Sequence, residues 1–243
     1  MARREIWSEA QLVSLRRGLL SWYDVNRRKL PWRGDAPPYG AAVLPDGIEP
    51  STAVSAYGTW VSEVMLQQTR VDTVIPFYVR WMARWPAVAD LAAASDEDVA
   101  AAWAGLGFYR RCRNLHAGAK AVMASPSQSI PSSVSQLKAL PGIGDYTAGA
   151  IASIAFGSAE ALVDGNVVRV LSRLQVIESR WPDLAFVNLP RRPPRCICDA
   201  GIIRGPKGCF YYACDMGGGA PASRRGPTRG LQSGEVPHLF VVT

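Results

Sequence analysis

Apolar side chains recur every three or four residues over most of positions 1–180, which is the spacing of one face of an α-helix. A capping box at Ser8 starts the first predicted helix, which runs to about Arg27. The same spacing predicts helices over 59–67, 69–85, 95–105, 109–123, 133–139 and 145–156, and another that begins near 166. Thr69 and Ser95 each precede an Asp by three residues and are the predicted caps of two of them. No strand pattern interrupts the series, so the predicted fold class is all-α.

Two stretches break the helical pattern. Residues 36–56 are rich in Pro, Gly and Ala without periodicity, which predicts a loop insertion. Residues 182–243 hold eight Pro, nine Gly and four of the five Cys, a composition typical of a disordered extension. The sequence therefore predicts a helical domain over 1–181 followed by a tail over 182–243.

The net charge of +7 favours a polyanionic partner such as nucleic acid, although many basic proteins never touch DNA. No run of about 18 apolar residues occurs, as a membrane span would need. Residues 1–10 carry Arg3, Arg4 and Glu5 in place of an apolar signal core. We therefore expect an intracellular protein with neither a membrane span nor a secretion signal.

The segment 140–144, Leu-Pro-Gly-Ile-Gly, lies between two short predicted helices. A lone Gly-x-Gly would more often be an ordinary turn between packed helices. Here Asp-Tyr-Thr-Ala-Gly-Ala follows over 145–150, and the combination is typical of a helix-hairpin-helix motif over 133–157. Such a hairpin grips the DNA backbone, without reading sequence, through Gly142, Ile143 and Gly144, because glycines and the N–H groups at the next helix start approach a phosphate.

Together with that hairpin, the stretches 60–69, 105–109 and 163–167 resemble motifs of the adenine DNA glycosylases, which remove adenine mispaired with 8-oxoguanine. Residues 30–33, Leu-Pro-Trp-Arg, are similar to an upstream pocket motif of that family. The resemblance covers roughly the first three-quarters of the chain. It implies the helix-hairpin-helix DNA glycosylase fold, which is a helical barrel.

Glycosidic cleavage needs an acid for the leaving group and a carboxylate that stabilises an oxocarbenium-like sugar. By the resemblance, Glu63 has the position of the general acid that protonates adenine N7. Asp164 has that of the carboxylate at the anomeric carbon, which it stabilises or bonds transiently. Apolar neighbours such as Val64 would raise the pKa of Glu63. Judged by residue type alone, each carboxylate would be a solvated helix or turn residue.

The target base must leave the stack before catalytic groups can reach it. The resemblance implies wedge and intercalation positions at Gln68, Leu106 and Phe108, and an adenine pocket at Leu30, Trp32 and Arg33. Thr69 and Tyr146 complete the predicted substrate-binding residues. The family usually has Tyr where this chain has Phe108, so stacking is kept while a hydroxyl contact is lost. Without the resemblance, 30–33 would be a Trp-anchored loop on the core with a surface Arg.

Two further residues refine the predicted chemistry. Asn166 would cap the last predicted helix, and the resemblance adds a catalytic role beside the abasic sugar. Tyr146 stands where glycosylase-lyases of the endonuclease III type carry a Lys that attacks the sugar. A phenol cannot form that Schiff base, which favours a monofunctional glycosylase.

The resemblance also implies a 4Fe-4S cluster held by cysteines spaced Cys-x6-Cys-x2-Cys-x5-Cys. The tail cysteines do not match: Cys196, Cys198, Cys209 and Cys214 are separated by one, ten and four residues. The family's iron–sulfur region is therefore not recognisable, and no metal ligands match its pattern. Four thiols could also hold zinc, although a paired Cys-x2-Cys ribbon is absent from the sequence. We interpret these cysteines as incidental to a tail that diverges from the family.

The leading hypothesis is a base excision repair glycosylase that removes adenine paired with 8-oxoguanine or guanine. A catalytically impaired isoform that only binds DNA or repair partners is an alternative, and so is a related mismatch or pyrimidine glycosylase. The implied partner is double-stranded DNA containing adenine mispairs, with other repair proteins as further candidates and no membrane. The expected location is the nucleus, with the mitochondrion as the alternative.

Overall fold

The computed structural model describes residues 9–158 and 160, and within them every regular element is a helix. The all-α prediction is confirmed for these residues, whereas the helix predicted near 166 lies outside them. In chain order the elements are α1 (Glu9–Asn26), the 3₁₀ turn η1 (Pro31–Arg33), α2 (Ala56–Leu66), α3 (Val71–Arg84), α4 (Val88–Ala93), α5 (Asp96–Trp103), α6 (Tyr109–Ala124), α7 (Val134–Leu137) and α8 (Asp145–Phe156).

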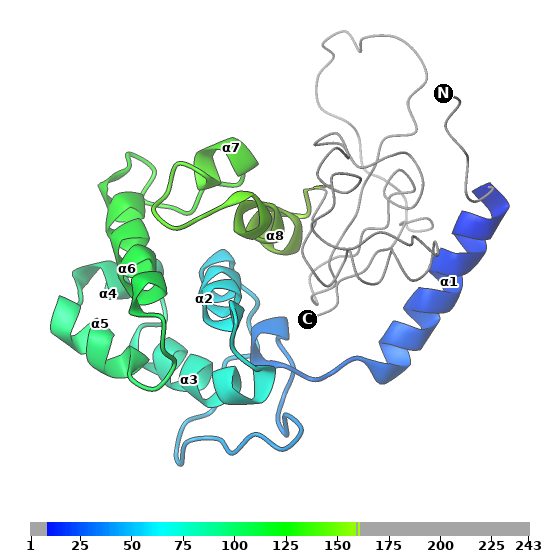
Figure 1. Ribbon diagram of the computed structural model, residues 1–243, viewed down its shortest axis with the longest axis horizontal. Helices are drawn as coiled ribbons and strands as arrows, with labels where there is room; N and C mark the ends of the chain where they lie inside the picture. The colour runs from blue at the N-terminus through cyan, green and yellow to red at the C-terminus, as the bar shows by residue number, and fades with distance from the viewer. Residues whose placement is uncertain (1–8, 159, 161–243) are drawn as a thin grey trace, which may run out of the picture.

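Helix α2 lies in the middle of the helical body, where it packs against α8, α3 and α6 (Figure 1). Residues 57–65 are buried without a break, and most of them are apolar, although Thr59, Ser62 and Glu63 are buried with them. Residues 147–153 of α8 are also all buried, and most have small side chains that let α2 come close. Helix α6 packs on α4 and α5, and α7 packs on α8.

Tryptophans join the helices around α2. The ring of Trp81 on α3 meets Trp85 edge-on at 4.8 Å between centroids and Trp103 of α5 at 5.5 Å. Its buried indole N–H donates a hydrogen bond of 3.0 Å to the hydroxyl of Tyr57 on α2. These contacts fix α2, α3 and α5 to one another and support the loops at their ends.

Helix boundaries agree with the predicted ones to within three residues, but two details need correction. Ser95 caps α5 as predicted, because its hydroxyl accepts from the Asp98 N–H at 3.0 Å. The predicted cap at Thr69 is wrong: α3 begins after Arg70, whose side chain makes no capping bond. Helix α4 was not predicted, since it has six residues and follows Ala87 rather than a capping side chain.

The predicted loop insertion contains no regular element from residue 34 to residue 55. Tyr39 of this loop is nevertheless only 2% exposed and belongs to the hydrophobic core. The Tyr39 hydroxyl donates to the backbone oxygen of Asp35 at 2.8 Å. The start of this loop is thus anchored on the body beside η1.

Helix α1 extends away from α2–α8, to which the segment 27–30 connects it (Figure 1). Leu20 and Tyr23 on this helix are buried, whereas Trp22 is 57% and Val25 83% exposed. Tyr23 contacts the body, because its ring centroid lies 5.7 Å from the Arg33 guanidinium carbon.

Candidate nucleic-acid interface and active site

Glu63, the predicted general acid, lies on the central helix α2 and is only 6% exposed. Its neighbours Val61, Val64 and Met65 are equally buried. Glu63 is thus a buried carboxyl among buried residues of α2. One helical turn further on, α2 ends and the chain enters the loop at Gln67 and Gln68. Glu63 thus lies beneath the loop that carries one of the predicted wedge residues.

The predicted adenine pocket residues form η1 and its N-cap, and all are buried: Leu30 is 1%, Trp32 8% and Arg33 6% exposed. The Trp32 ring packs edge-on against Tyr78 of α3 at 5.3 Å. Arg33 donates to the backbone oxygen of Arg28 at 3.3 Å and lies over Tyr23. Arg33 is therefore an interior residue held at the junction with α1, and not a surface arginine.

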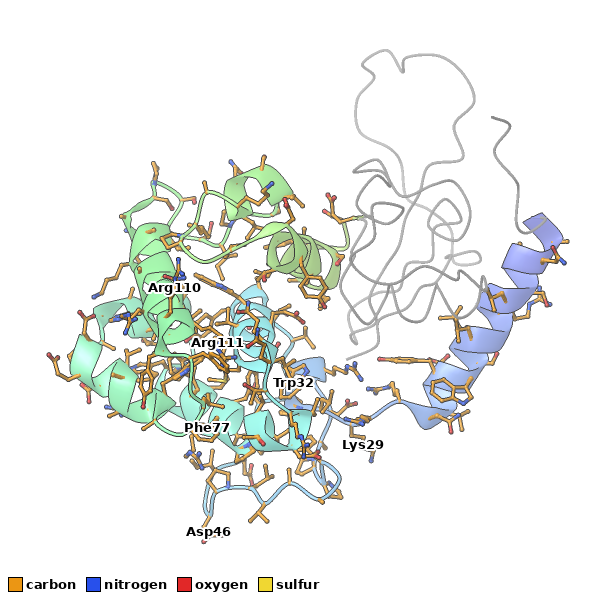
Figure 2. The ribbon with its side chains drawn as sticks, viewed as in Figure 1. Lys29, Trp32, Asp46, Phe77, Arg110 and Arg111 are labelled. Atoms are coloured by element: carbon orange, nitrogen blue, oxygen red, sulfur yellow. The ribbon has the colours of Figure 1, made fainter. Side chains whose placement is uncertain are left out.

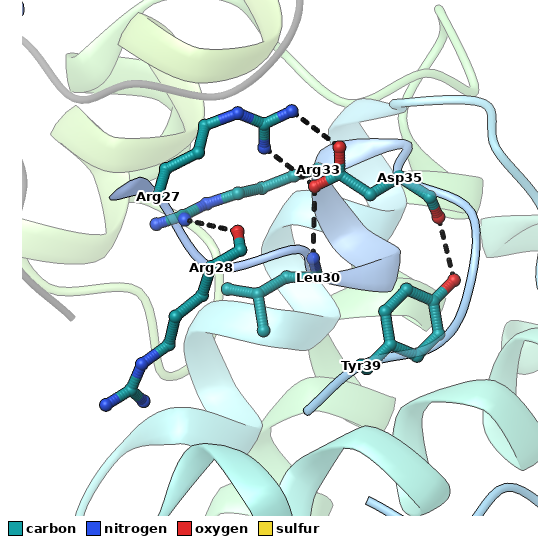
Figure 3. Close-up of polar contacts among 6 residues, drawn as sticks. All are labelled: Arg27, Arg28, Leu30, Arg33, Asp35 and Tyr39. Carbon is teal, nitrogen blue, oxygen red and sulfur yellow. Dashed lines mark hydrogen bonds and ion pairs between the residues drawn. The ribbon is translucent and has the colours of Figure 1, made fainter. Parts of the chain in front are cut away.

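An ion pair that the sequence did not predict holds this segment in place (Figure 3). Both terminal nitrogens of Arg27 donate to the Asp35 carboxylate, at 2.7 and 2.6 Å, in a bidentate pair. The Leu30 N–H donates to the same carboxylate at 3.0 Å. Asp35 therefore closes a loop that contains the whole pocket motif.

Burial alone would raise the pKa of Asp35. The hydrogen bonds from Arg27 and from the Leu30 amide, together with the charges of Arg27 and Arg33, lower it below the ordinary value. Asp35 is thus held as a carboxylate, which is the form that the bidentate pair requires.

The predicted wedge residues Gln68 and Phe108 share an unusual backbone conformation. Their φ angles are 57° and 48°, in the left-handed region that non-glycine residues rarely adopt. Phe108 is 60% exposed, so its ring projects from the surface. Leu106, the third predicted residue of this group, is only 5% exposed and belongs to the core. Of the two predicted residues in the 105–109 loop, Phe108 is therefore the one that projects.

A surface pocket of about 280 Å³ lies between these two loops and the hairpin. Its walls are formed by the end of α2, the first two turns of α6, and the turn at Pro141 and Gly142. Gln68 and Phe108 both contribute to it, and Arg110 adds a positive charge. The pocket brings together three segments that the sequence had linked to DNA separately.

Arg111, on the first turn of α6, was missed by the sequence reasoning (Figure 2). Its guanidinium carbon lies 5.4 Å from the Trp103 ring centroid and 5.3 Å from the Phe108 ring centroid. The guanidinium also donates hydrogen bonds to backbone oxygens at the end of α2 and in the 105–109 loop. One terminal nitrogen donates to the backbone oxygens of Val64 (3.0 Å), Met65 (2.9 Å) and Gln67, and the other to Leu106 O (3.2 Å), Gly107 O (3.4 Å) and the hydroxyl of Thr69 (3.2 Å).

The hairpin between α7 and α8 has the backbone that its sequence requires. Gly142 adopts φ +77°, and Gly144 is the N-cap of α8 in an extended conformation. Both glycines are exposed, whereas Ile143 is 6% exposed and anchors the turn in the core. Lys138 forms an ion pair with Asp145 across the hairpin. The start of α8 is thus presented at the surface, as phosphate binding requires.

Tyr146, the second residue of α8, is half-buried behind the hairpin. The other two predicted catalytic residues, Asp164 and Asn166, lie outside the described residues, and so does the tail with its four cysteines. The described residues therefore bring the wedge loops and the hairpin to one pocket, whereas residues 30–33 pack against α2 and α3. Of the predicted catalytic residues, Glu63 alone is described.

Metal ligands are not grouped in the described part of the chain, where no three His, Cys, Asp or Glu side chains cluster. Its cysteine, Cys112, is buried, and burial raises the pKa of the thiol to about 11. A thiol of that kind is a poor metal ligand, because ligation needs the thiolate. In the same region, none of the helices is both long and apolar enough to span a lipid bilayer.

Solved structures with a similar fold include a thermostable thymine-DNA glycosylase, with a TM-score of 0.55 and 22% identity over 67% of each chain. Another is an endonuclease III–DNA complex, with a TM-score of 0.55 and 19% identity over 74% of each chain. These structural similarities show that the chain has the helix-hairpin-helix glycosylase fold.

Sequence similarity is much higher to proteins named adenine DNA glycosylase. The human protein is 50% identical over 169 residues, which are 69% of this chain and 29% of the relative. The Arabidopsis thaliana protein is 44% identical over 198 residues, or 74% of this chain and 30% of the relative. The chain thus spans about a third of the length of these relatives.

Residues 61–185, just over half of the chain, match the model of the HhH-GPD superfamily base excision DNA repair proteins. The match includes Glu63, both wedge loops and the complete hairpin. The chain therefore belongs to the HhH-GPD superfamily of base excision DNA repair proteins.

Proposed function

We propose that this chain is a monofunctional DNA glycosylase that excises adenine paired with 8-oxoguanine or guanine. The observation that carries the proposal is the position of Glu63, a buried carboxyl on the central helix, one turn before the loop that carries Gln68. The identity of 44–50% to proteins named adenine DNA glycosylase supports adenine as the base.

The proposed reaction begins when Gln68 and Phe108 enter the helix stack and the adenine leaves it. The carboxyl proton of Glu63 moves to adenine N7, the bond between C1′ and N9 breaks, and the electron pair leaves with the base. Asp164 stabilises the oxocarbenium-like sugar or bonds transiently to C1′, and Asn166 is proposed to assist at the same sugar. Water then adds to C1′ and its proton goes to the Glu63 carboxylate, which restores the acid, so that an abasic site and free adenine remain.

The hairpin supplies affinity without sequence preference in this proposal. Backbone groups of Gly142, Ile143 and Gly144 hold a phosphate at the start of α8. The buried Leu30, Trp32 and Arg33 act on the base indirectly or after rearrangement, because each is at most 8% exposed. The expected DNA is a duplex with an adenine mispair, and the expected location is the nucleus or the mitochondrion.

Tyr146 supports a monofunctional reaction, because its phenol cannot form a Schiff base with the sugar. For the iron–sulfur cluster of the family, the described residues provide no ligand set. The tail cysteines also depart from the family's spacing. We therefore propose that the tail cysteines do not bind the family's cluster, and about four irons per chain after anaerobic purification would overturn this.

A single-turnover glycosylase assay on matched duplexes tests the function. The duplexes carry adenine opposite 8-oxoguanine, guanine or thymine, and thymine opposite guanine. Release of adenine from the first two, with little from the adenine–thymine pair, supports the proposal. Release of thymine would instead indicate a mismatched-thymine glycosylase. Tight binding without release from any duplex would indicate a form that only binds DNA.

A further inference from the structure

Arg111 is the point where two loops meet that are far apart in sequence. Its Nη1 donates to the last carbonyls of α2, including Val64 O, which is 47 residues away in the chain. Its Nη2 donates to Leu106 O and to the Thr69 hydroxyl. One guanidinium thus ties the loop that carries Gln68 to the loop that carries Phe108.

The carbonyls at the end of α2 need an outside donor, since the last four of any helix have no partner within it. A cation at this end also interacts favourably with the helix dipole. Arginine is suited to the position because its planar fork offers donors in several fixed directions, whereas a lysine ammonium is a single point. The Arg111 cation lies against both the Phe108 and Trp103 rings, which orients its plane further.

Both loops need such support, because each contains a residue in a costly conformation. Gln68 and Phe108 have positive φ angles, and conformations of this kind persist where the surroundings impose them. Without a common anchor, the two loops could relax independently of each other. A pair of wedges that moves independently would open a duplex less efficiently than a pair held at a fixed separation.

We propose that Arg111 is a positioning residue, which holds the Gln68 and Phe108 loops as one rigid wedge for extruding the target base. This inference rests on the proposed function for its role in the reaction, but not for its effect on the two loops. Arg111 does not serve as a phosphate ligand here, because its terminal nitrogens are already bonded to protein oxygens. The exposed Arg110, which lines the same pocket, is better placed to meet DNA.

The first test needs no DNA. In the full chain, Arg111→Lys keeps the charge but cannot reach both loops, so amide hydrogen exchange over 67–69 and 106–108 should accelerate together, by about tenfold or more. Amides of α3 should be unchanged. The matched control is Arg84→Lys, since Arg84 also joins two helices through its ion pair with Asp98 and lies over Trp85. Acceleration in neither loop, or in one loop alone, would overturn the proposal.

The second test separates positioning from chemistry. Arg111→Lys should slow single-turnover adenine excision from a mispaired duplex by about tenfold or more. The same variant should come within about threefold of the wild type when two unpaired nucleotides flank the adenine, because that base is already unstacked. Arg84→Lys should match the wild type on both substrates.

Equal slowing on both substrates, or no slowing on either, would show that Arg111 does not act through base extrusion. If the wild-type chain excises adenine from neither substrate, the proposed function fails. The exchange measurement then still decides whether Arg111 holds the two loops together.

Discussion

Gly142 of the hairpin lies directly against Asn114 of α6: a Cβ built on Gly142 would stand 2.5 Å from the Asn114 Cβ. The same glycine has φ +77°, so both its backbone and its surroundings exclude a side chain. Gly144, two residues later, has open space where its Cβ would be. The two glycines of one hairpin therefore have different roles.

This difference predicts different outcomes for two alanine substitutions. Gly142→Ala should lower the free energy of unfolding by about 1 kcal/mol or more and also weaken DNA binding. Gly144→Ala should leave stability nearly unchanged and weaken DNA binding alone, because the added methyl occupies space that a phosphate needs. Thermal unfolding and fluorescence anisotropy with a short duplex measure the two quantities. If Gly144→Ala binds DNA as tightly as the wild type, the hairpin does not face the backbone.

The Arg27–Asp35 pair predicts a pH-dependent contribution to stability. Because the folded-state pKa of Asp35 is lowered, the contribution is complete above the ordinary value of 3.8 and is lost as pH falls through the lower folded value. Asp35→Asn should therefore cost about 1–2 kcal/mol near pH 7, and the difference from the wild type should shrink toward pH 3.

Urea unfolding at several pH values measures this difference. The control is Asp46→Asn, an exposed residue of the same loop, which should have little effect at any pH (Figure 2). A destabilisation by Asp35→Asn that is as large at pH 3 as near pH 7 would contradict the ionic role of the pair.

Phe108 allows a test of the wedge without a large effect on folding, because its ring is 60% exposed. Phe108→Ala should reduce single-turnover excision by about tenfold or more, whereas Phe108→Tyr should stay close to the wild type, since it keeps the stacking ring. Both replacements are non-glycine residues at the same positive φ, so the backbone cost is similar. Unchanged excision by the alanine variant would remove Phe108 from the proposed wedge.

The residue at position 146 predicts whether the protein forms a covalent Schiff base with abasic DNA. With Tyr146 in place of an amine, borohydride should trap little or no covalent complex between the protein and abasic DNA. Denaturing gel electrophoresis with labelled DNA detects such a complex, and an established glycosylase-lyase serves as positive control. Efficient trapping would show that another amine attacks the sugar, and the monofunctional assignment would then be wrong.

The sequence predicted features whose physical cause is local. Ser95 could be recognised as a cap because its partner, the Asp98 N–H, is three residues away. Thr69 showed the same pattern, but its hydroxyl is bonded to Arg111, and a neighbour distant in sequence cannot be read from a capping motif. Helix α4 was not predicted because it has only six residues and its N-cap, Ala87, has no capping side chain. Local signals thus predicted the described helices other than α4, but not all of their ends.

Candidate site residues follow the same rule. Glu63 and the hairpin glycines were found because family motifs surround them, whereas Arg111 was missed. Most partners of Arg111 are backbone oxygens, which every residue type provides, so they leave no signature in sequence. Asp35 was missed for a related reason, because its partner Arg27 lies on the other side of the pocket motif. Interactions that close long loops become visible only in three dimensions.

The proposed adenine excision depends most directly on the carboxyl proton of Glu63. Glu63→Gln keeps the size and hydrogen-bonding capacity of the side chain but removes that proton. In single-turnover assays on a duplex with adenine opposite 8-oxoguanine, the variant should be slower by on the order of 100-fold or more. Its affinity for the same DNA should be nearly unchanged. Excision by Glu63→Gln at the wild-type rate would contradict the proposed mechanism.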